Sequence, residues 1–272
     1  MVERKEMNGG EILRKMRRLS PRVHCIANAA AAPDVANVLL AAGARPILAQ
    51  GPEETGEIAA SCSAAVLNFG TPDGEKMRAI RLAAAGAAAA GIPSIADPVG
   101  AGASSWRREQ VLGIMREIPF SAIHCNYSEA LVLLGQDGGF QGVDSAFASL
   151  GERIAAAERT ASEYGCPVLL SGAEDVVSDG NRTWVIRGGA AIMSRVTGTG
   201  CMLSALAGAF CSVEQDRAAA LSAAASFWKA CGEWAWRQTE AAEGGPGTFR
   251  AKLMDAAFKL ENWRENIEYT ER

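Results

Sequence analysis

Residues 194–212 of the chain read SRVTGTGCMLSALAGAFCS, a glycine- and threonine-rich turn that runs directly into an apolar helical pattern. The turn consists of Thr197, Gly198, Thr199 and Gly200. Backbone N–H groups at a helix start lack intrahelical acceptors, and the helix dipole adds partial positive charge there. Glycines let an anion approach the backbone, and threonines add hydroxyl donors. Two interpretations stay open at this point: an anion-binding turn, or a core helix that Thr199 merely caps.

Cys201 lies in the first turn of the predicted helix. This position lowers the pKa of a thiol and favours the thiolate, so the residue is a candidate base or nucleophile. The alternative is a small apolar side chain that fills a gap. The common nucleotide-binding loops are excluded, because the sequence has no Gly-x-x-x-x-Gly-Lys-[Ser/Thr] and no Gly-x-Gly-x-x-Gly after a predicted strand.

The rest of the chain alternates short apolar runs with helical patterns. The predicted strands are residues 23–28, 46–49, 64–70, 93–98, 121–126 and 167–172, and the predicted helices between them include 33–43, 75–91 and 149–165. This alternation predicts an α/β fold with a central, mostly parallel sheet and helices on both faces. An Asp-Gly-Asn turn inside residues 174–187 predicts a hairpin at the edge of the sheet. After residue 200 we expect helix almost to the end.

Composition and charge narrow the class of protein. The chain has 272 residues, 49% of them hydrophobic and 21% charged, with no linker or repeat, so we expect a single domain over 1–272. Residues 1–20 form an N-terminal helical segment whose helix runs over 11–19, and they lack the apolar core of a secretory signal. The net charge of −4 argues against nucleic-acid and anionic-membrane partners. Seven cysteines without a Cys-x-x-Cys pair indicate reduced thiols in the cytoplasm.

Polar residues follow nearly every predicted strand, where ligands bind in open α/β sheets. Asp97 ends the fourth strand, and Asn126 and Glu129 follow the fifth at a spacing that puts both on one face of a turn or helix. Two carboxylates and an amide suit Mg²⁺, which prefers oxygen ligands and keeps several waters. Taken singly, each of these residues is equally well explained as a helix cap or an exposed acid.

The motifs VTGTGCMLSAL, DPVGAGA, NYSEA, VLNFGT, DVAN and GPGTF occur in the order and spacing of the hydroxyethylthiazole kinases. The resemblance covers residues 23–260 and implies a ribokinase-like fold. It further implies transfer of the γ-phosphate of Mg-ATP to the primary alcohol of 4-methyl-5-(2-hydroxyethyl)thiazole, a salvage step in thiamine biosynthesis. Family members are typically homotrimers with active sites at subunit interfaces, so the resemblance also implies that assembly here.

The same resemblance implies roles for individual residues. The turn of Gly198, Thr199, Gly200 and Cys201 would be catalytic, with Cys201 at the place of the superfamily's base. The thiazole pocket would be lined by Asn28, Leu48, Gly70 and Gly198. The ATP contacts would be His124, Asn126, Ser171 and Thr197. The Mg²⁺ ligands, acting mainly through water, would be Asp97, Asn126 and Glu129.

Two departures from the family pattern bear on function. His124 stands where the family usually has arginine, and it lacks the permanent charge and two-pronged donor of arginine. Ala29 to Ala32 replace larger residues beside Asn28, which suggests a remodelled pocket or a lost subunit contact, whereas Leu48 in place of methionine conserves volume. Three hypotheses follow: a hydroxyethylthiazole kinase, a kinase of the same fold for another small heterocyclic alcohol, or a binding or regulatory homologue with little turnover.

Overall fold

A nine-stranded sheet forms the middle layer of the computed structural model, which describes residues 8–136 and 148–271. Its strand order is β2-β1-β3-β4-β5-β6-β7-β8-β9. The first six strands in this order are β2 (Arg45–Ile47), β1 (Arg22–Ile26), β3 (Ala64–Asn68), β4 (Ser94–Asp97), β5 (Ala122–Asn126) and β6 (Val168–Ser171). All neighbours among them pair in parallel. The six predicted strands and the mostly parallel sheet are therefore confirmed.

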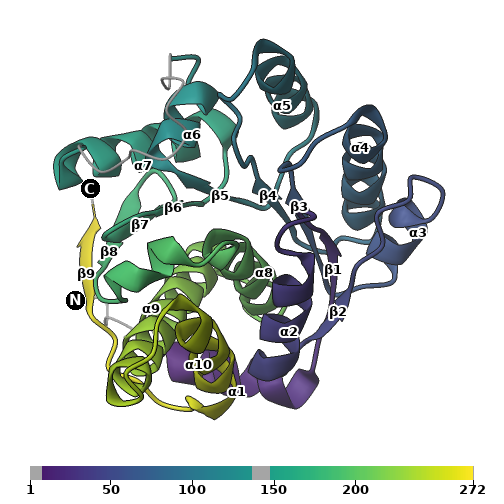
Figure 1. Cartoon of the computed structure of the whole chain (residues 1–272). Helices are drawn as coiled ribbons and strands as arrows, with labels where there is room; N and C mark the ends of the chain where they lie inside the picture. The colour runs from purple at the N-terminus through teal and green to yellow at the C-terminus, as the bar shows by residue number, and fades with distance from the viewer. Residues whose placement is uncertain (1–7, 137–147, 272) are drawn as a thin grey trace.

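The remaining three strands are antiparallel: β7 (Asp175–Ser178), β8 (Arg182–Ile186) and β9 (Ile267–Glu271). The predicted hairpin within 174–187 is β7 and β8, but its predicted place at the sheet edge is wrong. The C-terminal strand β9 pairs outside β8, with Ile267 opposite Ile186, and so forms the edge (Figure 1). The expectation that the chain after residue 200 is nearly all helix is confirmed up to residue 259, but the chain ends in the strand β9 and not in a helix. The rings of Trp184 and Tyr269, 5.3 Å apart, help to hold β9 in this register.

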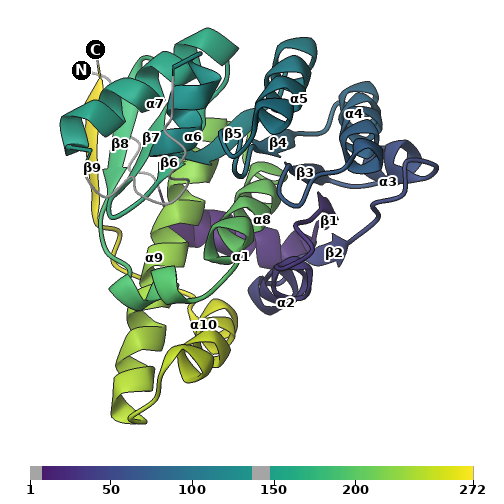
Figure 2. The same cartoon turned by 45° about the horizontal axis from the view of Figure 1, so that its top comes forward.

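Helices cover both faces of the sheet (Figures 1 and 2). One face carries α1 (Gly9–Leu19), α2 (Ala32–Ala42), α8 (Thr199–Cys211), α9 (Arg217–Ala241) and α10 (Pro246–Lys259). The other carries α4 (Gly74–Ala89), α5 (Ser105–Glu117), α6 (Tyr127–Leu133) and α7 (Leu150–Tyr164), with α3 (Thr55–Ala60) packed on α4. The 3₁₀-helix η2 (Ala191–Arg195) precedes α8.

Residues 1–7 of the predicted N-terminal segment lie outside the described residues. In the part of the chain described, no helix combines the length and apolar character needed to span a membrane.

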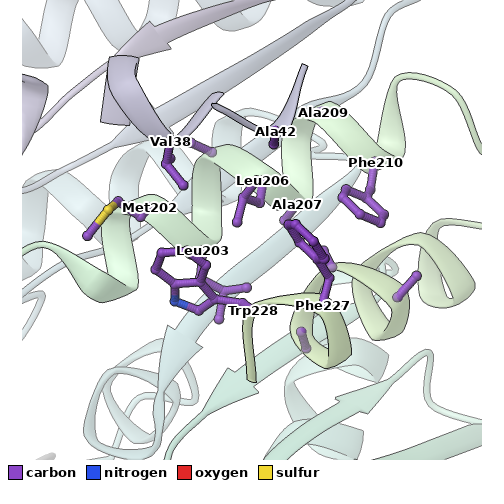
Figure 3. Close-up of a cluster of buried hydrophobic side chains, with 14 of the residues drawn as sticks. Val38, Ala42, Met202, Leu203, Leu206, Ala207, Ala209, Phe210, Phe227 and Trp228 are labelled. Carbon is purple, nitrogen blue, oxygen red and sulfur yellow. The ribbon is translucent and has the colours of Figure 1, made fainter. Parts of the chain in front are cut away.

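Successive side chains of each strand point to opposite faces of the sheet and pack into two hydrophobic cores. In β3, Ala64 and Val66 face the core under α8, whereas Ala65 and Leu67 face the core under α4. Because the parallel strands are buried on both faces, their sequences are apolar runs without polar alternation. In the first core, side chains of α8 pack against those of α2 and α9, as Figure 3 shows.

Helix α8 lies unusually close to the sheet because Gly208 has no side chain. A Cβ atom at Gly208 would overlap the Cγ2 of Val66 on β3. All residues from Met202 to Cys211 are buried, and all of them except Ser204 are apolar or lack a polar side chain. The close approach sets the position of the first turn of α8 relative to the ends of the strands.

We expect Gly208→Ala to destabilise the protein by about 1–3 kcal/mol, because the added methyl group overpacks the contact with β3. Gly113→Ala is the matched control. It lies inside α5, where a new Cβ would come no closer than 3.9 Å to its nearest neighbour, the Nη2 of Arg81, and it should stabilise by about 0.5–1 kcal/mol. Urea denaturation of both variants measures the difference. Equal stabilisation by the two alanines would show that α8 does not lie this close to β3.

Candidate functional site

The carboxyl ends of the parallel strands bring most of the predicted site residues to one edge of the sheet. Asn68 and Asp97 end β3 and β4 directly opposite each other, and Asn126 and Ser171 do the same for β5 and β6. The first turn of α8 meets this edge, where Cys201 contacts Asn68. This is the location that parallel α/β sheets use for ligands.

The glycine-threonine turn has the conformation of an anion site. Gly198 is the N-cap of α8 and adopts a left-handed conformation with φ of 88°. The amide of Met202 donates to Gly198 O at 2.8 Å, whereas the amides of Thr199, Gly200 and Cys201 have no acceptor among the described residues. Gly200 is exposed, so an anion can reach these amides. The alternative that Thr199 caps the helix is wrong, since Gly198 is the cap and no side chain caps the turn.

Hydrogen bonds from the side chains of Thr199 and Trp228 fix the backbone of the turn. The Thr199 hydroxyl donates to Met193 O at 3.3 Å, and Trp228 Nε1 on α9 donates to Thr199 O at 3.2 Å. Trp228 is buried, so its indole both fills the core and fixes the backbone of the turn. The three free amides are therefore held in place before any anion binds.

Asp97 is a buried carboxylate held through one oxygen. Its Oδ2 accepts from Asn68 Nδ2 at 2.5 Å and from the Ser204 hydroxyl at 2.6 Å, and its Oδ1 has no partner among the described residues. Burial raises the pKa of Asp97, while His124, the two hydrogen bonds and Lys76 act in the opposite direction. One carboxylate oxygen thus stays available at the edge of the sheet.

Asn126 and Glu129 form a capping box at the start of α6. Glu129 N donates to Asn126 Oδ1 and Asn126 N donates to Glu129 Oε2, both at 2.9 Å. The second oxygen of Glu129 accepts from Gly100 N at 2.8 Å, which ties α6 to the loop after β4. Burial and the nearby Asp97 raise the pKa of Glu129 to about 7. The cap interpretation and the common face are both confirmed, while the role of these residues toward Mg²⁺ stays a prediction.

These oxygens fit Mg²⁺ held mainly through water. No group of three or more His, Cys, Asp or Glu side chains that could hold a metal occurs within residues 8–136 and 148–271. Among the carboxylate oxygens of Asp97 and Glu129, only Asp97 Oδ1 has no hydrogen bond to any of the described residues. Mg²⁺ commonly keeps several waters and takes one or two carboxylates plus substrate phosphates. The donor set therefore suits an ion that arrives with a nucleotide.

Cys201 is a neutral thiol in this site. Its Sγ accepts from Asn68 Nδ2 at 3.4 Å. Burial, together with Asp97 and Glu129, raises the pKa of Cys201 to about 12, against smaller opposite effects of Asn68 and Lys76. The expectation that the helix start favours a thiolate is wrong, because burial beside two carboxylates outweighs the helix terminus.

Lys76 on α4 joins the two loops expected to hold the acceptor. Its Nζ donates to Ala27 O at 2.8 Å and to Gly70 O, which follow β1 and β3. Burial lowers the pKa of Lys76 to about 8, although Cys201, Asp97 and Asp73 act in the opposite direction. Lys76 is thus a buried cation beneath the predicted thiazole pocket.

The loops after β1 and β3, which are expected to bind the alcohol, lie against each other, and the loop after β1 also lies against the glycine-threonine turn. A Cβ atom on Gly70 would lie 2.6 Å from Asn28 Nδ2, and one on Gly198 would lie 2.7 Å from the Cβ of Ala31. Asn28 and Gly70 therefore lie side by side, and Gly198 lies against Ala31 of the same loop as Asn28, while their role toward the thiazole stays a prediction. Leu48 follows the edge strand β2 and is exposed.

The residues expected to contact ATP lie at two places. Thr197 is exposed beside the turn, and Ser171 is half-buried at the end of β6. Behind Ser171, Lys229 on α9 donates to Gly172 O and Ala173 O, both at 2.8 Å, and lies 3.3 Å from Asp175 Oδ1. This buried ion pair and the two hydrogen bonds fix the loop that follows β6.

Comparison with known proteins places the chain among phosphotransferases. A family model described as the hydroxyethylthiazole kinase family matches residues 13–263. A hydroxyethylthiazole kinase of Listeria monocytogenes serotype 4a (strain HCC23) is 39% identical over 251 residues, which is 92% of this chain and 91% of the relative. The kinase of the same name from Nitratidesulfovibrio vulgaris (strain DP4) is 39% identical over 246 residues, 90% of each chain. The chain belongs to the hydroxyethylthiazole kinase family.

Solved structures agree on the ribokinase-like fold. The hydroxyethylthiazole kinase structure from Pyrococcus horikoshii OT3 matches with a TM-score of 0.86 and 32% identity over 97% of this chain and 99% of that one. The pyridoxal kinase of Staphylococcus aureus, solved with AMP-PCP and pyridoxal, matches with a TM-score of 0.64 over 92% of this chain and 99% of its own. At 16% identity the second likeness concerns the fold alone.

The departures from the hydroxyethylthiazole kinase pattern have structural explanations. Ala31 is buried directly against Gly198, so its side chain packs on the turn, while a remodelled pocket or a lost subunit contact stays a prediction. Ala29 and Ala30 are exposed. His124 is buried and hydrogen-bonded to Ser204, so it offers almost no surface to a nucleotide. The structure does not support the expected contact of His124 with ATP.

Sequence reasoning missed Lys76, Ser204 and the pairing of Asn68 with Asp97. Ser204 lies three residues after Cys201 and hence on the same side of the predicted helix, a spacing that could have indicated it. Asn68 ends a predicted strand, as Asp97 does. Lys76 carries no local signal, because a lysine near a helix start is usually solvated.

We expect the titration of Lys76 to make the free energy of unfolding depend on pH. Its pKa is about 8 in the folded protein and ordinarily 10.5, so between these values unfolding takes up a proton. The free energy of unfolding should therefore rise with pH across this window for the wild type relative to Lys76→Met. Chemical denaturation at pH 7 to 10.5 measures this difference. Lys252→Met, at a partly exposed position on α10, is the control, and equal pH profiles for the two variants would contradict the assignment.

Proposed function

We propose that this chain transfers the γ-phosphate of ATP to the primary alcohol of 4-methyl-5-(2-hydroxyethyl)thiazole, as the names of its relatives indicate. The observation that carries the proposal is the turn at Gly198, whose three free amides begin a helix that contacts Asn68, the partner of Asp97, and whose Gly198 lies against Ala31 in the loop that begins at Asn28. An anion hole between an alcohol pocket and an oxygen-rich edge is the arrangement that phosphoryl transfer needs.

In this mechanism the amides of Thr199, Gly200 and Cys201 stabilise the charge of the transferred phosphoryl group. They stand at the positive end of α8 and are already oriented, so they require no reorganisation during the reaction. The loops tied together by Lys76 hold the alcohol in line with the γ-phosphorus. The alcohol oxygen forms the new bond to phosphorus as the bond to the β–γ bridging oxygen breaks.

The alcohol proton leaves without the help of a strong base. The pKa of about 12 keeps Cys201 protonated at neutral pH, so its sulfur cannot take up that proton early in the reaction. Because the transition state of phosphoryl transfer is loose, the alcohol proton is lost late and passes to a phosphate oxygen or to water. Cys201 then contributes packing and its contact with Asn68.

Mg²⁺ would neutralise the charge of the β- and γ-phosphates. We propose that Asp97 holds it through Oδ1, with Asn126 and Glu129 acting through water.

Ser171 and Thr197 would bind ATP, and Leu48 would join the thiazole pocket. We further propose a homotrimer with interfacial sites, because members of the hydroxyethylthiazole kinase family typically assemble in this way. Cytoplasmic location is supported by the seven free cysteines.

The direct test is ADP release from Mg-ATP with the thiazole alcohol as acceptor and a control without acceptor. We expect acceptor-dependent turnover at 1–10³ s⁻¹, roughly the usual range for enzymes. Mass spectrometry of the product should show one added phosphate. Absence of turnover in folded protein that binds ATP would refute the proposed acceptor, and a panel of heterocyclic alcohols would then identify the substrate.

Variants separate the roles of thiol and carboxylate. We expect Cys201→Ala to lower kcat by about tenfold or less, because a neutral thiol supplies no base. Asp97→Ala should lower kcat by about 10²–10³-fold, a loss typical of a group that stabilises transition-state charge. Steady-state kinetics at saturating Mg-ATP measures both. A Cys201→Ala enzyme that folds and binds ATP but has no activity would show that the thiol is the essential base.

A further inference from the structure

The two histidines of the chain are buried in opposite hydrogen-bonding arrangements. His24 on β1 has its Nε2 2.7 Å from Ala49 O, and its Nδ1 has no partner in the described residues. His124 on β5 has its Nδ1 2.5 Å from the Ser204 hydroxyl oxygen, and its Nε2 is the atom without a partner among those residues. Each buried ring therefore has one nitrogen in a hydrogen bond and one nitrogen without a partner, which is the arrangement of a neutral imidazole with a single N–H proton.

The contacts of Ser204 determine the tautomer of His124. The Ser204 hydroxyl has one proton, and the acceptors beside it are Asp97 Oδ2 at 2.6 Å and Gly200 O at 3.2 Å. Donation to the carboxylate is the stronger choice, because its acceptor is ionised. His124 must then donate from Nδ1 to the oxygen of Ser204. In this tautomer the buried Nε2 carries only a lone pair. The other tautomer would bury an N–H at Nε2 without an acceptor, and the Ser204 proton would then be donated to Nδ1 instead of to Asp97.

We propose that His124 and Ser204 are positioning residues that hold Asp97 with Oδ1 directed to the reaction site, an inference that rests on the proposed kinase function. The Nδ1–H of His124 orients the Ser204 hydroxyl, whose proton points to Asp97 Oδ2. Asn68 Nδ2 donates to the same oxygen at 2.5 Å. Because both donors engage Oδ2, rotation of the carboxylate is blocked and Oδ1 stays free.

The surroundings of His124 support a positioning role over a nucleotide contact. The imidazole is only 3% exposed, and the charged groups that act on it are the carboxylates of Asp97 and Asp175. Its Cε1 would lie 3.9 Å from a Cβ atom on Gly200, so the ring lies beneath the anion-binding turn. The residue that departs from the family's arginine is thus part of the support of Asp97 in this chain.

Nitrogen-15 NMR of histidine-labelled protein tests the tautomer without any need for activity, since protonated and bare ring nitrogens have different chemical shifts. We expect His124 to carry its proton on Nδ1 and His24 to carry its proton on Nε2. A His24→Gln variant assigns the two rings. Protonation of His124 on Nε2 would overturn the proposal, and this result does not depend on which alcohol the enzyme uses.

Kinetics tests the consequence for Asp97. We expect Ser204→Ala to lower kcat at least tenfold, with KM for ATP and for the alcohol changed less than about twofold. Ser222→Ala is the matched control, because it removes an equally buried helical hydroxyl, bonded to Ala218 O, from a position on α9. A purely structural serine would lower the melting temperature in both variants without this selective loss of kcat, which would overturn the proposal.

His124→Arg restores the residue usual in the family and separates positioning from nucleotide binding. We expect kcat to fall at least tenfold in this variant without any decrease in KM for ATP. A lower KM for ATP with kcat retained would show that position 124 faces the nucleotide and would overturn the proposal. If the wild type has no turnover with the thiazole alcohol, the proposed function fails while the NMR result still decides the tautomer.

Discussion

The contact between α8 and the sheet is the constraint on which the site depends. Gly208 lets the helix lie directly on Val66 of β3, and the helix is buried from Met202 to Cys211. This close packing places the first turn of α8 at the carboxyl ends of β3 and β4. There Cys201 meets Asn68, and Ser204 meets Asp97. The anion-binding amides and the carboxylate are thus parts of one packed unit.

Burial at this contact also determines the charges of the site. The pKa values of Asp97, Glu129 and Cys201 are raised, and those of Lys76 and His124 are lowered, with desolvation as the largest cause in each case. The positive potential that an anion meets therefore comes mainly from fixed backbone amides and the end of α8. Such dipoles keep their orientation throughout a reaction, which is the property that transition-state stabilisation requires.

Small residues at the site are explained by how close its parts lie. Gly198 needs its left-handed φ and also leaves room for Ala31, and Gly70 leaves room for the Asn28 amide. The loop after β1 consequently lies against both the turn and the loop after β3, and Lys76 donates to a carbonyl of each loop. The family's arginine position has changed in the same region, and its histidine contacts Ser204 instead of solvent. Compact packing links the acceptor side, the anion hole and Asp97.

The sequence by itself determined the α/β class, the six parallel strands, and the turn and strand-end residues at which the site lies. Those features follow from local patterns: apolar runs of strand length, helical spacing, and glycines before a helix. It could not indicate β9, because a five-residue strand at the chain end gains its stability from pairing with β8, residues 182–186. Nor could it indicate the contacts of Lys76 with Ala27 and of Ser204 with Asp97, which join residues 49 and 107 positions apart in the chain. The protonation of Cys201 was likewise decided by tertiary structure alone, because burial beside Asp97 and Glu129 outweighs the helix start that local sequence reveals.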